Sequence, residues 1–233
     1  MTAALYVSDS TGTTQAVKVV YIADGSAVRL VKLIYASDST GTTQLVYSAF
    51  TPEILTYTTV ANGTITIPPY CFTMEIEVWG PSGLPGHGAG SGDTLAGGGG
   101  AGSGGYAHSI FSVGQAAGQT INFSVAANNF TSNVYSGTFT LTTLSGFSGG
   151  NGEDAPSAGR SGTEGAAGAT GTGGNVNNAP GLAGSAGTDL GGAAGAGVVG
   201  VNGVGQSGGH GGSGSANAGL TPGVPGLVIV KFS

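Results

Sequence analysis

The sequence predicts an all-β protein in two parts: a small N-terminal β-hairpin domain, and a C-terminal β-sandwich carrying glycine-rich loops packed as a polyproline II helix bundle. Two observations predict it. Glycine recurs at every third position through much of the second half of the 233-residue chain, and apolar and polar residues alternate in several short runs. Alternation is the period of a half-buried strand, whereas about three residues per turn is the period of polyproline II.

Residues 1–50 contain few glycines and an internal duplication. The motif at residues 6–15 returns almost unchanged at residues 35–44, and each copy has apolar residues on either side of an Asp-Ser-Thr-Gly turn. A further strand pair is predicted around the Asp-Gly-Ser turn at residues 24–26. Hairpins of this size are marginally stable alone. This favours a module that pairs with copies of itself or with a larger scaffold, and a self-contained small β domain is the alternative.

Residues 51–63 are interpreted as a connector, and the sandwich is assigned to residues 64–233. In its first predicted strand, Phe72, Met74, Ile76 and Val78 alternate with Thr73, Glu75, Glu77 and Trp79, which is the period of a half-buried strand. Further strands are predicted at residues 106–113, 120–125, 138–144 and 227–232. The first and last strands would bracket the glycine-rich stretches and hold both of their ends.

The glycine-rich stretches are predicted to form short rods joined by turns. A residue without a side chain at each third position lets neighbouring backbones approach closely and bond through N–H and C=O groups. Collagen needs an unbroken register and abundant proline, but here the register slips, and residues 146–219 contain only Pro156 and Pro180. A disordered linker is the alternative. The predicted rods include residues 159–174, 181–187, 197–203 and 205–214.

Five short motifs follow one another in a defined order. They are Ile67-Pro68-Pro69, Met74-Glu75-Ile76-Glu77-Val78-Trp79-Gly80, Gly104-Gly105-Tyr106-Ala107, Gly118-Gln119-Thr120-Ile121 and Pro225-Gly226-Leu227-Val228-Ile229-Val230. In order and spacing, across residues 57–233, this set resembles the glycine-rich domain of bacteriophage tail proteins. The resemblance implies a small β-sandwich with glycine-rich loops, which some tail-fibre tip adhesins pack as polyproline II helices. Family members usually continue with glycines after the Trp-Gly pair, whereas Pro81, Leu84 and Pro85 interrupt the run here.

Composition narrows the classes of partner. The formal charge is −6, and the five cations (Lys18, Arg29, Lys32, Arg160 and Lys231) form no basic patch, so nucleic-acid binding is not expected. The single cysteine, Cys71, allows no internal disulfide and no cysteine-based zinc site, and is expected to be a buried strand residue. No signal peptide and no run of about 18 apolar residues is found, which predicts synthesis in a host cytoplasm without membrane insertion.

Catalytic motifs are matched only by chance. The chain contains G-x-G-x-x-G and G-x-S-x-G patterns, but no helical pattern follows them, so neither a pyrophosphate site nor a nucleophile elbow is predicted. The adjacent carboxylates Glu153 and Asp154 should point apart on an extended backbone, which argues against an acid–base pair. The chain is therefore not expected to be an enzyme.

No cofactor or metal is expected. Asp93, Asp154 and Asp189 lack the regular surroundings of calcium-binding nonapeptide repeats. The three histidines, His87, His108 and His210, could meet around a metal, but lone histidines in polar loops are more often surface or contact groups. His108 is expected to be a strand residue beside Tyr106.

Polar side chains on turns between the rods are the candidate receptor contacts, because rigid scaffolds with variable loops are common recognition sites. The candidates are Asn175, Asn177, Asn178, Asp189, Asn202 and His210, joined by Phe130 and Tyr135 if the β loops share that end. The resemblance implies a tail-fibre or tail-tip adhesin in the virion. Its N-terminal module would bind other tail or fibre proteins, its glycine-rich domain would bind a host cell-surface protein or glycan, and a homotrimer is among the expected states.

Two alternatives come from other classes. A purely structural tail-tip or decoration protein would make no receptor contact, and the many small Ala-Gly tips favour it. An ice-binding protein is the second alternative, since some antifreeze proteins bundle glycine-rich polyproline II helices with a flat face of small residues. Those proteins are secreted and stapled by disulfides, and this chain has neither property.

Overall fold

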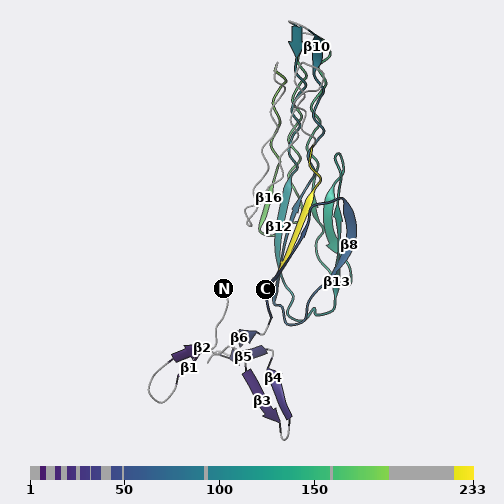
Figure 1. The fold of residues 1–233 in the computed structure, drawn as a ribbon. Coiled ribbons are helices and arrows are strands. Elements are labelled where there is room, and N and C mark those ends of the chain that lie inside the picture. Colours follow the sequence, from purple (N-terminus) through teal and green to yellow (C-terminus); the bar gives the residue numbers. More distant parts are fainter. Residues whose placement is uncertain are drawn as a thin grey trace.

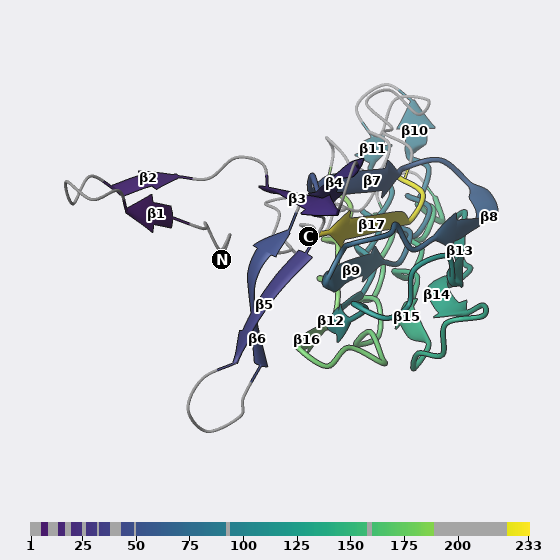
Figure 2. The ribbon, with the colours of Figure 1, turned by 90° about the horizontal axis from the view of Figure 1, so that it is seen from below.

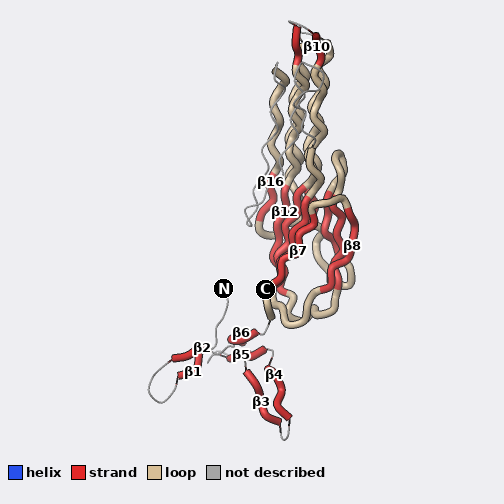
Figure 3. The backbone as a smooth tube through the Cα atoms, in the orientation of Figure 1, coloured by secondary structure: helices blue, strands red, loops and turns tan. Residues whose placement is uncertain are grey.

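The structure, a computed structural model, describes residues 50–91, 94–157, 160–188 and 223–233, and the backbone of six strands in the N-terminal part. All the regular secondary structure of these residues is β, and Figure 3 shows strands joined by long extended segments. The all-β prediction is confirmed.

The six N-terminal strands form three two-stranded antiparallel hairpins. The hairpins are β1 (Tyr6–Ser8) with β2 (Thr14–Ala16), β3 (Val20–Asp24) with β4 (Ala27–Val31), and β5 (Leu33–Ser37) with β6 (Thr43–Ser48). The first and third hairpins carry the two copies of the duplicated motif, with one strand on each side of its polar residues, as predicted.

Two antiparallel sheets form the sandwich, and Figure 2 shows them as facing layers. The five-stranded sheet has the order β16 (Asn177–Ala179), β12 (Tyr106–Ser112), β9 (Thr73–Trp79), β17 (Leu227–Phe232), β7 (Glu53–Tyr57). The four-stranded sheet has the order β15 (Leu144–Gly146), β14 (Ser132–Ser136), β13 (Thr120–Val125), β8 (Ala61–Thr66).

The core lies between the sheets and follows directly from the alternation in the sequence. In β9, Met74, Ile76 and Val78 are fully buried on the inner face. The facing sheet contributes buried aliphatic and aromatic side chains, namely Ile65, Ile121, Phe123, Val134 and Leu144. Apolar area removed from water in this way stabilises a domain by roughly 25 cal/mol per Å². Burial in this two-layer core is therefore the main stabilising contribution to the sandwich, to which the glycine-rich segments are joined.

One predicted strand is wrong. Residues 138–144 were expected to form a strand, but β14 ends at Ser136 and β15 begins at Leu144. The segment between them turns, because the Ser136 hydroxyl accepts a hydrogen bond from Leu141 N at 3.0 Å and donates one to Leu141 O at 3.0 Å. Leu141 is buried and Phe139 packs against the core. The alternation of apolar and polar residues here therefore arises from a turn whose apolar side chains face the core, and not from a strand.

The predicted connector is also wrong. Residues 51–63 contain β7, which pairs with β17, and the first part of β8, which pairs with β13. The sandwich therefore begins near residue 50 rather than at residue 64. The alternation in β7 is weak because an edge strand buries little, although Leu55 and Tyr57 still pack against the core.

Cys71 is buried, as expected, but it precedes β9 instead of lying in a strand. It follows Tyr70, which has a positive φ of 69° in the turn before the strand. The thiol donates a hydrogen bond to Pro68 O at 3.2 Å. Burial raises the pKa of this thiol above its ordinary value, because the charged thiolate would lose its hydration.

The sandwich has two distinct ends. At the entry pole, β7 begins at Glu53 opposite Phe232, and Ser233 O accepts hydrogen bonds from Phe72 N and Thr73 N, both at 2.8 Å. At the rod pole, Trp79, Tyr106 and Leu227 pair across neighbouring strands and the chain continues into the glycine-rich segments. In Figure 1 these segments extend away from the sheets, on the side opposite the C-terminus.

Candidate functional site: the glycine-rod bundle

Among the described residues, five extended segments project from the rod pole and form the glycine-rod bundle. Rod 1 (residues 80–88) continues β9, and rod 2 (residues 97–105) leads into β12. Rod 3 (residues 147–155) follows β15, rod 4 (residues 160–174) runs back, and rod 5 (residues 181–188) leaves β16. Because rods 1, 2, 3 and 5 adjoin strands, the sandwich fixes one end of each of them.

Rods 1 and 2 form one long hairpin. Gly80 N, Gly83 N and Gly86 N donate to Gly105 O, Gly102 O and Gly99 O at 2.9, 3.0 and 2.9 Å. These bonds recur every third residue, as about three residues per turn requires. The short strands β10 (Ala89–Ser91) and β11 (Thr94–Ala96) pair and close the hairpin at its far end (Figure 1).

Among the described rods, rod 2 is the central one, because it exchanges backbone hydrogen bonds with each of the other four. Gly105 N donates to Phe147 O in rod 3 at 2.9 Å, and Gly165 N in rod 4 donates to Gly100 O at 2.8 Å. Ser103 N donates to Leu182 O in rod 5 at 2.9 Å. The outer rods also bond to one another, as in Gly152 N to Leu84 O at 2.9 Å.

Glycine at each third position is a steric requirement of this packing. A Cβ on Gly102 would lie 1.9 Å from Ala166 O, and one on Gly83 would lie 2.0 Å from Gly150 O. Carbon and oxygen atoms do not approach so closely, and the clashing atoms belong to backbone that is itself hydrogen-bonded. The predicted bundle of glycine rods bonded through backbone groups is confirmed for the described rods.

Rod 1 corrects the interpretation of the residues that follow Trp79. Pro81, Leu84 and Pro85 interrupt the run of glycines but not the rod, because Gly80, Gly83 and Gly86 keep the three-residue register between them. The signal for rod 1 was present in the sequence as Gly-x-y spacing, and proline suits the φ of polyproline II.

Two buried serines replace glycine at crowded positions of the bundle. The Ser103 hydroxyl accepts a hydrogen bond from Leu182 N at 2.8 Å, and the Ser82 hydroxyl accepts one from Val224 N at 2.8 Å. Each hydroxyl takes the place of a backbone acceptor, so both side chains are fully buried without leaving the neighbouring N–H unbonded.

The predicted asparagine cluster lies beside the sheet, not at the far end of the bundle. Asn177 and Asn178 belong to β16, which pairs with β12 at the edge of the five-stranded sheet. The turn after rod 4 brings the chain back to the rod pole, because Val176 N donates to His108 O at 3.1 Å. The sequence could not place this turn, since every rod presents nearly the same backbone to its neighbours.

Two of these asparagines form structural bonds. The Asn175 amide accepts a hydrogen bond from Ile110 N and donates one to Ile110 O, both at 2.9 Å. The Asn178 amide bridges Gly174 N and Gly174 O at 3.0 and 2.9 Å. Asn177 is exposed. As receptor contacts, these three residues stay predictions. Asp189, Asn202 and His210, and the predicted rods at residues 197–203 and 205–214, lie outside the described residues.

The exposed leucines of the bundle were missed by sequence reasoning. Leu84 on rod 1 is 45% exposed and Leu182 on rod 5 is 51% exposed, although both are large apolar side chains. Their backbone oxygens bond to neighbouring rods, so the side chains are held on fixed backbone. The only sequence signal was a leucine in a row of small residues.

The carboxylates of rod 3 are separated, as expected from the extended backbone. Glu153 Oε2 accepts a hydrogen bond from the Thr163 hydroxyl at 2.7 Å, whereas Asp154 Oδ1 accepts one from His87 N at 2.7 Å. Each carboxylate therefore links rod 3 to a different neighbour. The pair tightens the distal part of the bundle.

The aromatic residues Phe130 and Tyr135 are both exposed, but only Phe130 lies near the rods. Its loop contacts the base of the bundle, because Asn129 N donates to the Ser148 hydroxyl at 3.0 Å and Asn128 Nδ2 donates to Ser82 O at 2.8 Å. Tyr135 lies within β14.

A buried polar cluster covers the outer face of the five-stranded sheet. The Tyr106 hydroxyl donates to Glu77 Oε1 at 2.6 Å, and both residues are almost fully buried. Glu75 lies between His108 and Lys231, with Oε1 at 3.1 Å from His108 Nε2 and Oε2 at 3.5 Å from Lys231 Nζ. His108 is thus a strand residue near Tyr106, as predicted, and its partner is a carboxylate.

No group of three or more metal-ligating side chains comes together among the described residues. Within the same part of the chain, no helix has the length and hydropathy needed to cross a lipid bilayer. No protein-family model matches the sequence, and no curated protein matches it significantly.

Proposed function

We propose that this chain is a bacteriophage tail protein, a tail-fibre or tail-tip adhesin that binds the host bacterial surface through its glycine-rod bundle. The N-terminal hairpins would attach it to other tail or fibre proteins. The single observation that carries the proposal is the polarity of the sandwich. Residue 50 and Ser233 lie at the entry pole, and the bundle projects from the rod pole.

This polarity suits an attachment protein. β6 ends at Ser48 and β7 begins at Glu53, so the N-terminal hairpins join the sandwich at the pole farthest from the bundle. A bundle that extends away from the attachment side is placed to meet a surface first. At about 3.1 Å per residue, the residues of rod 1 span about 28 Å.

The bundle also has the rigidity that recognition favours. Each described rod is bonded to at least two neighbours at three-residue intervals, and the rods lie so close that a Cβ on many of their glycines would collide with a neighbouring backbone. Side chains such as Leu84 and Leu182 are therefore presented without the entropy cost of ordering a free loop on binding.

Adsorption of the full-length protein tests the proposal. Labelled protein is added to cells of candidate host bacteria, and competition with phage particles for the same cells is measured. We expect saturable, strain-specific binding that blocks phage adsorption. Replacing Leu84 and Leu182 with serine should weaken it by about tenfold or more, because burying a leucine side chain against a partner is worth roughly 1.5–3 kcal/mol.

Ile54→Ser is the matched control. Ile54 is 57% exposed, and it lies on β7 at the entry pole, so its loss should leave adsorption unchanged. Folded protein that binds no strain infected by the phage would contradict the adhesin function.

A structural role in the virion is a second candidate, and one observation favours it. The exposed positions along the middle of rod 4 include Ala166, Ala167 and Ala169, which offer little chemistry for recognition. A bundle of this kind would fill space or join neighbouring subunits. It would be incorporated into the tail without competing for adsorption.

A further inference from the structure

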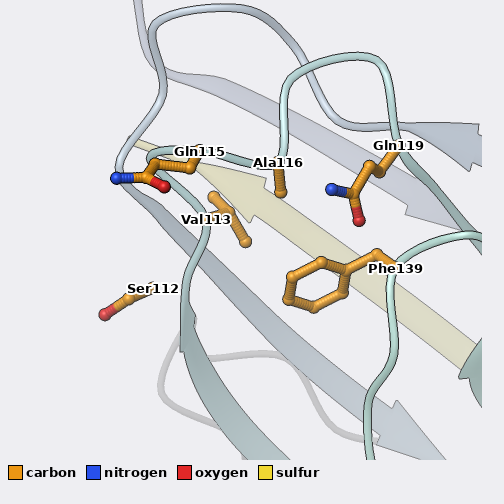
Figure 4. A pocket seen from close by; sticks show the side chains of 6 residues that line it. All are labelled: Ser112, Val113, Gln115, Ala116, Gln119 and Phe139. Atoms are coloured by element: carbon orange, nitrogen blue, oxygen red, sulfur yellow. The ribbon is translucent and has the colours of Figure 1, made fainter.

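A pocket opens at the entry pole, between the turn after β12 and the turn after β14 (Figure 4). It has a volume of about 320 Å³ and is lined by Ser112, Val113, Gln115, Ala116, Gln119 and Phe139. Small-molecule sites usually measure about 300–1,000 Å³. This pocket is at the lower end of that range, which suits one ring of a ligand.

The pocket combines an apolar floor with a polar rim. Val113 and Ala116 are buried, and the half-buried ring of Phe139 packs edge-on against Phe111 with the ring centroids 6.2 Å apart. Figure 4 shows Gln115 and Gln119 on either side of Val113 and Ala116. No charged side chain lines the pocket, so its chemistry favours a neutral ligand.

The polar side chains of the rim have hydrogen-bonding capacity to spare. Within the described part of the chain, the amides of Gln115 and Gln119 and the hydroxyl of Ser112 make no side-chain hydrogen bond. Each amide offers both a donor and an acceptor, and a serine hydroxyl offers both in one group. These are complementary to the hydroxyl groups of a sugar, which also donate and accept.

The backbone of the pocket argues against an extended peptide. Val113 N, Ala116 N and Gln119 N donate to Phe72 O, Val113 O and Ala116 O at 2.7, 2.8 and 2.9 Å. Phe139 N donates to Thr120 O at 2.9 Å. A peptide that binds as an added strand needs a row of unpaired backbone groups, and these four N–H groups are already bonded.

We infer that this pocket binds a single neutral sugar unit, with one sugar face against the Phe139 ring and the sugar hydroxyls bonded to Gln115, Gln119 and Ser112. Apolar C–H faces of a ring pack on an aromatic side chain, and the amides at the rim fix its orientation. The inference does not rest on the proposed function, because the pocket lies at the entry pole and the glycine-rod bundle extends from the opposite end.

The test uses the full-length protein and a panel of neutral monosaccharides: glucose, galactose, mannose, rhamnose, N-acetylglucosamine and N-acetylgalactosamine. Saturation-transfer NMR detects weak binding, and titration gives the dissociation constant. We expect at least one of these sugars to bind saturably, with a dissociation constant in the millimolar range. Glucuronic acid and glucosamine, which carry charges, should bind more weakly than their neutral parents.

Three variants locate the binding. Gln115→Ala and Gln119→Ala should each weaken binding by about tenfold, because each removes a rim amide but no backbone bond. Phe139→Leu keeps an apolar side chain and removes the ring, and should abolish the saturation transfer while thermal unfolding confirms a folded domain. Asn62→Ala, exposed on β8, is the control and should bind like the parent protein.

Three results would overturn the inference. The first is the absence of binding by every neutral sugar of the panel to folded protein. The second is binding that both glutamine variants leave unchanged, which would place it elsewhere. The third is capture of a peptide in this pocket with no sugar bound, which would indicate a protein partner. Adsorption of the leucine variants of the bundle is measured separately, so failure of one proposal is distinguishable from failure of the other.

Discussion

Some glycines of the bundle are required because a side chain at their positions would collide with the backbone of a neighbouring rod. Gly102 in the central rod has Ala166 O where a Cβ would be, at 1.9 Å, and the oxygen is fixed because it also accepts a hydrogen bond from Gly150 N at 2.8 Å. Glycine loses more conformational freedom on folding than any other residue. The bundle offsets this entropy cost with closely spaced backbone bonds and with the sandwich that anchors its rods.

We predict that Gly102→Ala destabilises the protein, because the added methyl group must push rod 4 away from rod 2. Overpacking of this kind costs about 1–3 kcal/mol. Urea unfolding of the full-length variant measures the loss. Ala167→Ser is the control, since Ala167 is exposed on rod 4 and should tolerate the change. Equal stability of Gly102→Ala and the parent would contradict the close packing.

Cys71 predicts a dependence of stability on alkaline pH. Burial raises the pKa of its thiol, so the folded state holds this proton more tightly than the unfolded state does. The stabilisation is complete below the ordinary thiol pKa, about 8.5, and is lost as pH rises through the higher pKa of the folded state. Burial, and then the charge of Glu53, also raise the pKa of Tyr57, which adds to the loss at still higher pH.

The measurement is the free energy of unfolding in urea between neutral and alkaline pH. We expect it to fall as pH rises above about 8.5, and to fall less steeply in Cys71→Ala, which lacks the thiol. Because the comparison uses slopes, the cavity left by the substitution does not affect it. Parallel slopes in the two proteins would exclude a contribution from Cys71.

At the scale of single elements, the short strand β16 is extended by side chains. Asn175 bonds both Ile110 N and Ile110 O, which prolongs the pairing of β12 beyond the three residues of β16. The asparagine amide here replaces one residue of an edge strand. Asn177, two residues later, is exposed and offers a matched comparison.

We predict that Asn175→Ala lowers the free energy of unfolding by about 1 kcal/mol, because it leaves two backbone groups of Ile110 to the solvent. Asn177→Ala should leave stability unchanged. Denaturation of the two variants side by side measures the difference. If Asn175→Ala were as stable as Asn177→Ala, the side-chain pairing would contribute nothing to the edge of the sheet.

Strands in which apolar and polar residues alternate without interruption were predictable from the sequence, and elements without such a pattern were not. β13 and β17 lie at the residues predicted for them, because their alternation is uninterrupted. The segment from residue 138 to residue 144 also alternates, yet the Ser136 hydroxyl bonds Leu141 and turns the chain. Local alternation reports which side chains are buried, and tertiary packing decides whether the backbone between them is straight.

For the whole molecule, the boundary of the sandwich has a direct consequence. β7 covers the edge of β17, and the first residues of β8 pair with β13, so both belong to the folded unit. A chain that starts at residue 64 would lose β7 and half of β8. The unpaired edge of β17 and the uncovered side of the core would then face water.

We predict that a fragment of residues 50–233 folds and that a fragment of residues 64–233 does not. Cooperative thermal unfolding, followed by circular dichroism, distinguishes them. The longer fragment should melt in one sharp transition, whereas the shorter one should show a broad transition or aggregate. A cooperative transition in the shorter fragment would mean that β7 is dispensable.

The sequence by itself determined the all-β class, the duplicated hairpins and the rods of glycine, because period and steric size are local properties of the chain. Only the tertiary structure decided which rod is central, where the turn carrying Asn175 lies, and that residues 51–63 belong to the sandwich. The reason is physical. Each rod offers its neighbours almost the same row of N–H and C=O groups, so the sequence does not determine which rods are adjacent. An edge strand buries few side chains, so its sequence shows little alternation. Both are positioned by the sheets to which they are joined.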